Sequence, residues 1–350
     1  MTGRFGRLRV PLDTPPMEAR LVGEIPEGAG WQFEPKWDGF RCLAFRDRGE
    51  VELMSKSGKP LGRYFPEVVA RLAALGQDRF VVDGELIVPA GATLSFAALQ
   101  ARLHPAASRI ARLSAETPAQ VILFDALEIG GALLRDEPLE QRRGALEDFV
   151  AAADAPDLLL SPMTVERDTA QAWLARSGGA LDGIVAKRRD EPYRAGERAM
   201  FKRKLRRTAD CVVGGFRYDA SGTKVASLLL GLYDEAGKLG LVGFVAGFTE
   251  ATRVELAARL EPLRGPSAFT GAAPGGPSRW SHGKSTEWVA LRPERVVEVA
   301  YDQVTGQRMR HGASFVRWRA DKAPRQCRLD QLEAELRPEE LARLLARTES

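Results

Sequence analysis

A lysine, an aspartate and an arginine stand close together in the segment FEPKWDGFRCLAF, which begins at Phe33. Lys36 precedes Asp38 by two residues and Arg41 by five, and apolar residues lie on both sides. Burying an ammonium group costs free energy unless a partner compensates its charge. Lys36 is therefore either a surface lysine at a turn or an amine whose surroundings change its reactivity.

Positive charge is concentrated in two other segments of the chain. Residues 186–207 carry a net charge of +7 and residues 308–328 a net charge of +6, whereas the whole chain carries only +4. The rest of the chain therefore carries −9. This distribution is typical of a protein that binds a phosphate-rich partner, and two solvated charged faces are the alternative interpretation.

The composition indicates a soluble protein of about two domains, with 44% hydrophobic and 28% charged residues among 350. The three cysteines are far apart and the three histidines are isolated, which argues against a disulfide framework or a zinc site. A metal would need oxygen ligands, which favours Mg²⁺ or Mn²⁺. Neither an apolar run of roughly 18 residues nor a signal-peptide core is found, so we expect a cytoplasmic protein.

Residues 1–207 show the pattern of an α+β domain. Their strands are joined by both hairpins and helices, which favours antiparallel sheets with flanking helices over a doubly wound sheet. We expect strands over 31–36, 40–47, 51–55, 79–88 (broken at Asp83-Gly84), 119–129 and 179–188, and helices over 62–75, 96–103 and 138–150.

After about Thr208 the pattern changes to successive short strands. Three strands are predicted over 210–218, 226–234 and 239–248, and a helix over 249–263 begins at Thr249 as its N-cap. Two further strands are predicted over 286–293 and 294–303. This is the order of the five-stranded OB barrel, a nucleic-acid-binding module. We place this OB domain at 208–328 and a helical tail at 329–350.

Seven segments in a fixed order resemble the motifs of the covalent nucleotidyltransferases, which include ATP-dependent DNA ligases, RNA ligases and capping enzymes. They are KWDGFR at Lys36, SKSGK at Ser55, DGELIV at Asp83, LFDAL at Leu123, LDGIVAKR at Leu181, FKRKLRR at Phe201 and RHGASFVRWRADK at Arg310. The chain length and the EPKWDGFR context most resemble the compact bacterial DNA ligases of the ligase C type. Those ligases consist of a nucleotidyltransferase (adenylation) domain and an OB domain, with no separate DNA-encircling domain.

The resemblance implies that Lys36 attacks the α-phosphorus of ATP, expels pyrophosphate and becomes lysyl-AMP, which is nucleophilic covalent catalysis. A free lysine has a pKa of about 10.4 and is almost entirely protonated at neutral pH. Nearby cations and partial burial disfavour the ammonium form. The cations expected around the nucleotide are Lys187, Lys202, Lys204 and a bound Mg²⁺.

The same resemblance implies roles for the residues that would bind the nucleoside. Glu34 would lie beside the adenine, and Arg41 and Glu85 would contact the ribose and phosphates. A glutamate in an apolar strand is costly without a partner, which favours a functional role for Glu85. Phe124 would stack on the adenine face, and ordinary core packing is the alternative for this residue.

Phosphate and metal contacts are implied for four further positions. Lys202 and Lys204 would offset charge that develops on the α-phosphate. Asp182 stands where the family usually has glutamate and would share a Mg²⁺ or Mn²⁺ ion with Glu85, although its side chain is one methylene shorter. Lys56 replaces the usual arginine and lacks its bidentate phosphate geometry.

In the last motif, Arg319, Asp321 and Lys322 resemble the group that swings in with the OB domain to orient the pyrophosphate leaving group. This implies that the domains close for lysine adenylation and reopen to bind DNA. Two residues keep two interpretations: Asp38 is a turn residue or steers Lys36, and Trp318 stacks on a base or sugar or packs in the core or an interface.

We therefore expect an ATP-dependent DNA ligase that seals nicks in duplex DNA, acting in repair. Its partners would be nicked double-stranded DNA and a repair polymerase or end-binding protein, and the chain would act as a monomer. The alternatives are an RNA ligase, a capping guanylyltransferase, and a non-catalytic nucleic-acid-binding module. The joint presence of Lys36, Glu85, Lys202 and Lys204 argues against the non-catalytic module.

Overall fold

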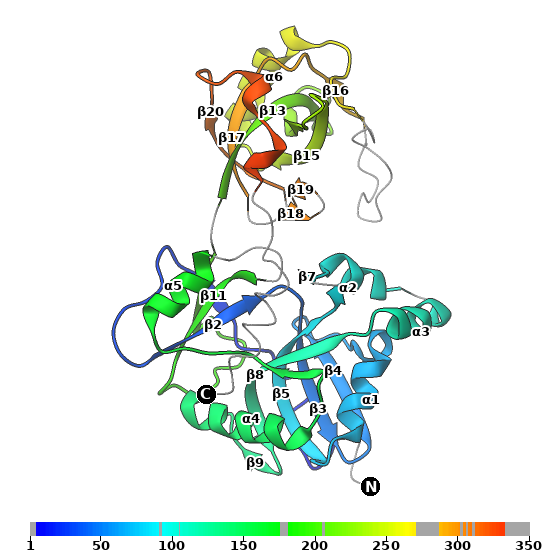
Figure 1. The fold of residues 1–350 in the computed structure, drawn as a ribbon, viewed down its shortest axis with the longest axis vertical. Coiled ribbons are helices and arrows are strands. Elements are labelled where there is room, and N and C mark those ends of the chain that lie inside the picture. The colour runs from blue at the N-terminus through cyan, green and yellow to red at the C-terminus, as the bar shows by residue number, and fades with distance from the viewer. Residues whose placement is uncertain are drawn as a thin grey trace. The chain divides into compact units, whose positions relative to one another are not determined.

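The computed structural model describes residues 5–90, 93–104, 106–175, 181–204, 207–270, 287–301, 304–305, 307–309 and 312–332. Within residues 1–334 the contacts divide the chain between 205 and 206 into an N-terminal and a C-terminal unit (Figure 1). The predicted domain boundary at 207/208 lies two residues further on, at the start of β13 (Arg207–Tyr218).

The larger sheet of the N-terminal unit has the strand order β10-β8-β5-β3-β4 within the described residues, and β9 pairs with β8. Its strands are β3 (Phe40–Asp47), β4 (Glu50–Ser55), β5 (Arg79–Ile87), β8 (Gln120–Ile129), β9 (Ala132–Leu133) and β10 (Leu158–Leu160). Among the described strands of this sheet, only the β10–β8 pair is parallel. The predicted break in β5 is wrong: the strand continues, and the irregularity is a register shift against β8 at Asp83/Gly84.

The smaller sheet has the order β1-β12-β11-β2 in the described part of the unit. It consists of β1 (Ala19–Leu21), β2 (Trp31–Trp37), β11 (Leu181–Arg188) and β12 (Met200–Arg203), and α5 (Arg167–Ala175) packs on β2 and β11 (Figure 1). The turn at Asp38-Gly39 carries the chain from this sheet to the larger one. A Cβ at Gly39 would lie 2.1 Å from the Leu86 carbonyl oxygen, so this close approach requires glycine.

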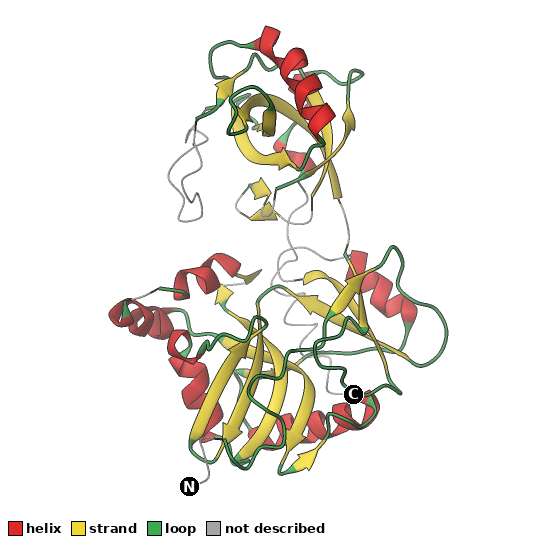
Figure 2. Ribbon diagram, turned by 180° about the vertical axis from the view of Figure 1, so that it is seen from behind, coloured by secondary structure: helices red, strands yellow, loops and turns green. Residues whose placement is uncertain are grey.

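Helices flank the larger sheet (Figure 2). Two of them pack on its strands, α1 (Pro66–Ala74) on β4 and α4 (Leu139–Ala153) on β8 and β10. The 3₁₀ turn Gly62–Tyr64, α2 (Phe96–Arg102) and α3 (Ala107–Glu116) also belong to this unit, and α3 packs on α1. The predicted helix over 62–75 is divided because Pro66 fits the first position of an α-helix and starts α1 there. Neither α3 nor α5 was predicted from the sequence. A small ribbon pairs β6 (Pro89–Ala90) with β7 (Thr93–Leu94).

The C-terminal unit contains a sheet of order β15-β14-β13-β17-β20, to which β16 is added beside β13. A bridge between Val245 and Ala313 joins its two ends. Its further elements are β14 (Val225–Tyr233), β15 (Leu239–Ala246), α6 (Glu250–Leu260), 3₁₀ turns at Glu261–Leu263, Pro324–Gln326 and Leu329–Gln331, β16 (Val289–Ala290), β17 (Val296–Tyr301), β18 (Val304–Thr305), β19 (Arg308–Met309) and β20 (Ser314–Trp318).

The predicted identity of the last two OB strands is partly wrong. The described part of the segment 286–293 contains only the short strand β16. The fifth strand in the order of the sheet is β20. The sequence interpretation missed β20 because its residues are mostly exposed and show little apolar alternation. The Thr249 side chain accepts a hydrogen bond from the Thr252 N–H, as the predicted N-cap requires. The α+β class with antiparallel sheets is confirmed.

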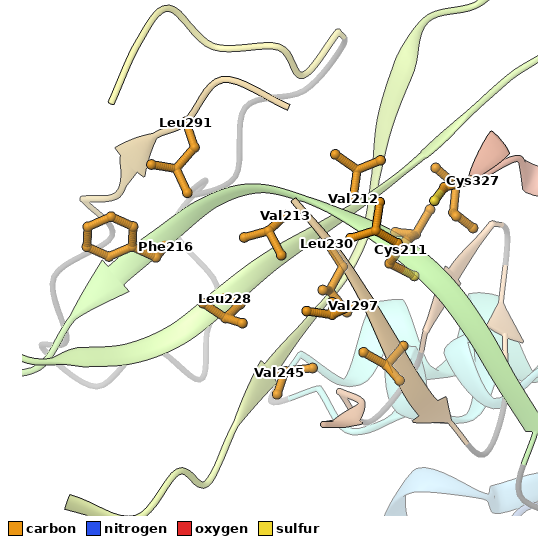
Figure 3. Close-up of a cluster of buried hydrophobic side chains, with 14 of the residues drawn as sticks. Cys211, Val212, Val213, Phe216, Leu228, Leu230, Val245, Leu291, Val297 and Cys327 are labelled. Carbon is orange, nitrogen blue, oxygen red and sulfur yellow. The ribbon is translucent and has the colours of Figure 1, made fainter. Parts of the chain in front are cut away.

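The core of the C-terminal unit is formed by apolar residues of its strands together with Leu256 and Leu260 of α6. Figure 3 shows part of this core. Cys211 and Cys327 are buried within it, and burial raises the pKa of the Cys211 thiol, so these cysteines act as apolar core residues. The predicted tail at 329–350 begins as a 3₁₀ turn on this unit, and its part from 333 onward lies outside the described residues. None of the described helices combines the length and apolar composition needed to cross a lipid bilayer.

Candidate active site

A cavity of about 1000 Å³ lies in the N-terminal unit. Its walls come from β2, β3, β5, β8, β11 and β12, so both sheets contribute. The side chains predicted to bind the nucleotide that line it are Glu34, Lys36, Arg41, Lys56, Glu85, Phe124, Lys187 and Lys202. Asp182 forms ion pairs with Lys36 and with Lys204 and so joins Lys204 to this group. Arg319 and Lys322 belong to the C-terminal unit.

Lys36 lies near the end of β2, and its side chain is 25% exposed. Among the described residues, its carboxylate partner is Asp182 of β11. Its Nζ is 2.6 Å from Asp182 Oδ2, and Lys204 Nζ is 2.9 Å from the same oxygen. Burial, followed by the charges of Lys36 and Lys204, lowers the pKa of Lys202. Two amines therefore contact one carboxylate while the charge of a third, Lys202, acts on the same group, and this excess of positive charge suits a phosphate group.

Lys187 lies deeper and has its own counter-charge. Its Nζ donates to Glu34 Oε2 at 2.9 Å and to the Phe124 carbonyl at 3.2 Å, and Gln32 Nε2 donates to the other Glu34 oxygen at 2.8 Å. Lys187 and Glu34 side chains are each only 3% exposed. The Lys187 ammonium also lies 4.8 Å from the centre of the Phe124 ring. Glu34 therefore offsets the charge of Lys187, and the role of Lys187 in the cation cluster around Lys36 stays a prediction.

Arg41 is fixed by a buried network that the sequence interpretation missed. Its Nε is 2.6 Å from Asp83 Oδ1, and the Tyr193 hydroxyl donates to Asp83 Oδ2 at 2.6 Å. Arg41 also donates to the Met17 carbonyl at 3.2 Å, and the Met17 N–H donates to the Tyr193 hydroxyl at 2.9 Å. Asp83 is fully buried, so the network holds Arg41 against the Phe124 ring at 4.6 Å and fixes the cavity rim at Met17. The only sequence signal for Asp83 was its place in DGELIV.

Glu85 is half-buried on β5 and accepts a hydrogen bond from the Gly39 N–H at 3.1 Å. Burial raises its pKa to about 7, against the opposing influence of Lys36 and Arg41. This carboxylate is therefore incompletely compensated, and a bound cation would favour its charged form.

The donor set for a metal ion is small. Among the described residues, no three His, Cys, Asp or Glu side chains lie together in a way that could hold an ion. Mg²⁺ is commonly bound by one or two carboxylates together with substrate phosphates and water. Glu85 lines the cavity, and Asp182 pairs with Lys36, which also lines it; that these two carboxylates hold an ion stays a prediction.

Lys56 lies at the mouth of the cavity, with its side chain 59% exposed, in the turn after β4. Its Nζ is 3.0 Å from Glu18 Oε2, and this hydrogen bond lowers the pKa of Glu18. Glu18 also lies 3.8 Å from Arg198. Nothing in the sequence pattern pointed to Glu18, because its partners are distant in the chain.

Arg319 and Lys322 follow β20 in the C-terminal unit and bind carboxylates of that unit. Both contact Asp210, and Arg319 also contacts Asp321. The hydrogen bond from Arg319 lowers the pKa of Asp321 to about 2. Trp318 packs edge-on against Phe315, with ring centres 5.8 Å apart, which is the packing alternative for this residue. The start of the RHGASFVRWRADK motif, at 310–311, lies outside the described residues.

Comparisons with known proteins assign both units. The family model of the ATP dependent DNA ligase domain matches residues 16–204, and that of the ATP dependent DNA ligase C terminal region matches residues 221–322. The chain is 47% identical over 335 residues to DNA ligase C2 of Mycolicibacterium smegmatis, covering 91% of this chain and 94% of that protein.

Two further relatives carry the ligase unit within a larger protein. The multifunctional non-homologous end joining protein LigD of Pseudomonas aeruginosa is 31% identical over 327 residues, which cover 92% of this chain and 37% of that protein. The crystal structure of the ligase domain from M. tuberculosis LigD has a TM-score of 0.50 and 29% identity, covering 90% of this chain and 98% of that domain. On these matches and the α+β architecture, the chain belongs to the ATP-dependent DNA ligases.

Proposed function

We propose that Lys36 is the nucleophile of this ligase. Its amine forms a bond to the α-phosphorus of ATP while the bond to pyrophosphate breaks, which gives lysyl-AMP. The AMP then passes to the 5′-phosphate at a nick, and the 3′-hydroxyl attacks that phosphate and displaces AMP. The observation that carries this proposal is the position of Lys36 Nζ in the cavity, beside Asp182 and the lysines 202 and 204.

In the structure Lys36 Nζ lies 2.6 Å from Asp182 Oδ2, so Asp182 fixes the position of the amine. The amine must be uncharged to attack phosphorus, and its ion pair with Asp182 is given up in the reaction. Lys204, which lies 2.9 Å from the same carboxylate oxygen, then remains as a positive partner of Asp182. Lys202 and Lys204 then face the charge that develops on the α-phosphate.

Glu85 and Asp182 would hold Mg²⁺ or Mn²⁺, and the ion would neutralise phosphate charge. We place the adenine near Phe124 and Glu34, and the ribose near Arg41. Arg319 and Lys322 are proposed to bind the pyrophosphate during lysine adenylation. The LigD relatives support a role in non-homologous end joining, with a repair polymerase or end-binding protein as partner. We propose that the chain acts as a monomer on nicked duplex DNA in the cytoplasm.

The test is to incubate the protein with α-labelled ATP or GTP and measure its intact mass. A species heavier by one adenylate, formed from ATP with Mg²⁺ and reversed by pyrophosphate, is expected. Nicked duplex DNA should then be sealed faster than nicked RNA. Labelling by GTP would indicate the capping reaction, and preferential sealing of RNA would indicate an RNA ligase, so either result would contradict the proposal.

The shorter side chain of Asp182 allows a test of the metal assignment. Asp182→Glu, which restores the family's usual residue, is expected to keep adenylation and to lower the Mg²⁺ concentration needed for half-maximal rate. Asp182→Asn should raise that concentration by at least about tenfold, since even outer-shell partners of metal sites have effects of this size. A Mg²⁺ titration of the adenylation rate measures both, and unchanged half-maximal concentrations would remove Asp182 from the metal site.

A further inference from the structure

One carboxylate in the C-terminal unit binds both cations of the RADK segment. Arg319 Nη1 lies 2.8 Å from Asp210 Oδ1 and 2.9 Å from Oδ2, and Lys322 Nζ lies 2.8 Å from Oδ2. The Asp210 side chain is only 10% exposed. Asp210 is 109 positions from Arg319 in the sequence, and no motif of the sequence analysis assigned it a role.

Asp210 is itself held firmly in place. It lies in β13, where it pairs in register with Glu298 of β17. Its backbone N–H donates to Gln331 Oε1 at 3.0 Å, and Gln331 Nε2 donates to its carbonyl at 3.3 Å. Its backbone is thus fixed by the sheet and by Gln331, and close packing around a side chain that is only 10% exposed restricts its rotamers.

The second carboxylate at Arg319 is of a different kind. Asp321 accepts from Arg319 Nε at 2.9 Å and from Nη2 at 2.8 Å, but its side chain is 66% exposed. Two cations and two carboxylates leave this cluster without net charge, and Asp321 occupies the Nε–Nη2 edge of Arg319, so a phosphate that binds this edge displaces Asp321. The exposed Asp321 can turn into water at little cost, whereas Asp210 cannot.

We propose that Asp210 is a positioning residue that orients Arg319 and Lys322 for the pyrophosphate leaving group, with Asp321 as the carboxylate that the phosphates displace. Fixing the side chains of an arginine and a lysine costs conformational entropy. Because Asp210 already holds both side chains, this entropy is lost on folding and not when ATP binds. With Nη1 held by Asp210, the Nε–Nη2 edge of Arg319 is left to face the ligand. The inference rests on the proposed role of these two cations in lysine adenylation.

The experiment compares Asp210→Asn with the wild-type chain in three reactions: lysyl-AMP formation from ATP, its reversal by pyrophosphate, and sealing of a nick that is already adenylated. The first two involve pyrophosphate and the third does not. Asp210→Asn should slow both pyrophosphate reactions by about 10- to 100-fold, the range expected for misplaced catalytic groups. Sealing of the adenylated nick should stay within a factor of about two.

Glu298→Gln is the matched control. Glu298 lies opposite Asp210 in the neighbouring strand and accepts a hydrogen bond from Arg317 at 2.6 Å, so this variant also removes a negative charge and an ion pair from the same sheet. The charge of Glu298 also acts on Arg319, with no hydrogen bond between them among the described residues, so this variant should change the two pyrophosphate rates by no more than about twofold. Equal slowing by Glu298→Gln, or slowing of all three reactions by Asp210→Asn, would show a general electrostatic or structural effect and overturn the inference.

Two further variants separate the role of Asp210 from that of the RADK segment, residues 319–322. Arg319→Ala should slow the two pyrophosphate reactions. If it does not, the proposed role of the RADK segment fails; if it does while Asp210→Asn leaves both rates unchanged, only the positioning role of Asp210 fails. Thermal unfolding of each variant checks folding. If Asp210→Asn does not fold, Asp210→Glu, which keeps the charge but displaces it, should show the same selective slowing, and unchanged rates would overturn the inference.

Discussion

Lys36→Arg is expected to form no protein–AMP adduct with ATP. Arginine keeps a positive charge next to Asp182, which lies 2.6 Å from the lysine amine, so the electrostatics of the cavity change little. A guanidinium stays protonated at any working pH and has no lone pair to offer phosphorus. The loss of adduct therefore isolates the chemistry of the amine from its charge. Labelled-ATP incorporation and intact mass measure it, with a decrease of at least about 10³-fold expected for a lost nucleophile.

The same variant should still seal a nick that already carries AMP, because that step breaks the bond to AMP without using the lysine amine. Lys238→Ala, at an exposed lysine in the turn before β15, serves as the control and should adenylate at the wild-type rate. An adduct on Lys36→Arg of normal yield would mean that another residue is the nucleophile. Loss of sealing on the adenylated nick would mean that the substitution disturbs the cavity as a whole.

The local elements and the motif residues could be predicted because their signals lie within a few positions of one another. The KWDGFR segment contains the end of one strand, a glycine turn and the start of the next, so its fold and its chemistry are both local. The apolar run over 119–129 likewise predicts the strand β8, whichever strands it pairs with in the fold. These segments meet at the cavity because the chain passes at Gly39 from β2 in the smaller sheet to β3 in the larger sheet.

The partners of the motif residues could not be predicted in the same way. Asp83 binds Tyr193, which is 110 positions away in the chain, and Asp210 binds Arg319 across 109 positions. Such pairs depend on the register of distant strands, which one sequence does not encode in any short pattern. The β20 strand was missed for a related reason: its pairing with β17 is set by the barrel, not by apolar alternation of its own residues.

Glu85→Gln is expected to abolish most adenylation and at the same time to stabilise the N-terminal unit. The amide keeps an acceptor for the Gly39 N–H, which donates to Glu85 at 3.1 Å, but it cannot ligate a cation well or charge-pair with Lys36. In the folded protein the pKa of Glu85 is raised from 4.5 to about 7, chiefly by burial. At pH 8 the wild-type chain must therefore hold a poorly compensated carboxylate that the variant lacks.

The sign of the pH dependence follows from proton binding. Between pH 4.5 and about 7 the folded state binds the Glu85 proton and the unfolded state does not, so this group's contribution to the free energy of unfolding falls as the pH rises. The shift corresponds to at most about 3 kcal/mol above pH 7, less what solvent screening removes at a half-buried side chain. The stabilisation by Glu85→Gln should be largest at pH 8 and vanish near pH 4.5.

Thermal unfolding of the wild type, Glu85→Gln and Glu24→Gln at pH 5 and pH 8 measures this difference. Each kcal/mol is worth about 2–4 °C in a unit of this size, so the melting temperature of Glu85→Gln at pH 8 should rise by several degrees. Glu24, an exposed glutamate in the same unit, should show no such change. A melting temperature that falls at pH 8 would mean that Glu85 is already well compensated without a cation. If the melting temperature rises and adenylation is lost, the charge of Glu85 serves the reaction and lowers the stability of the fold.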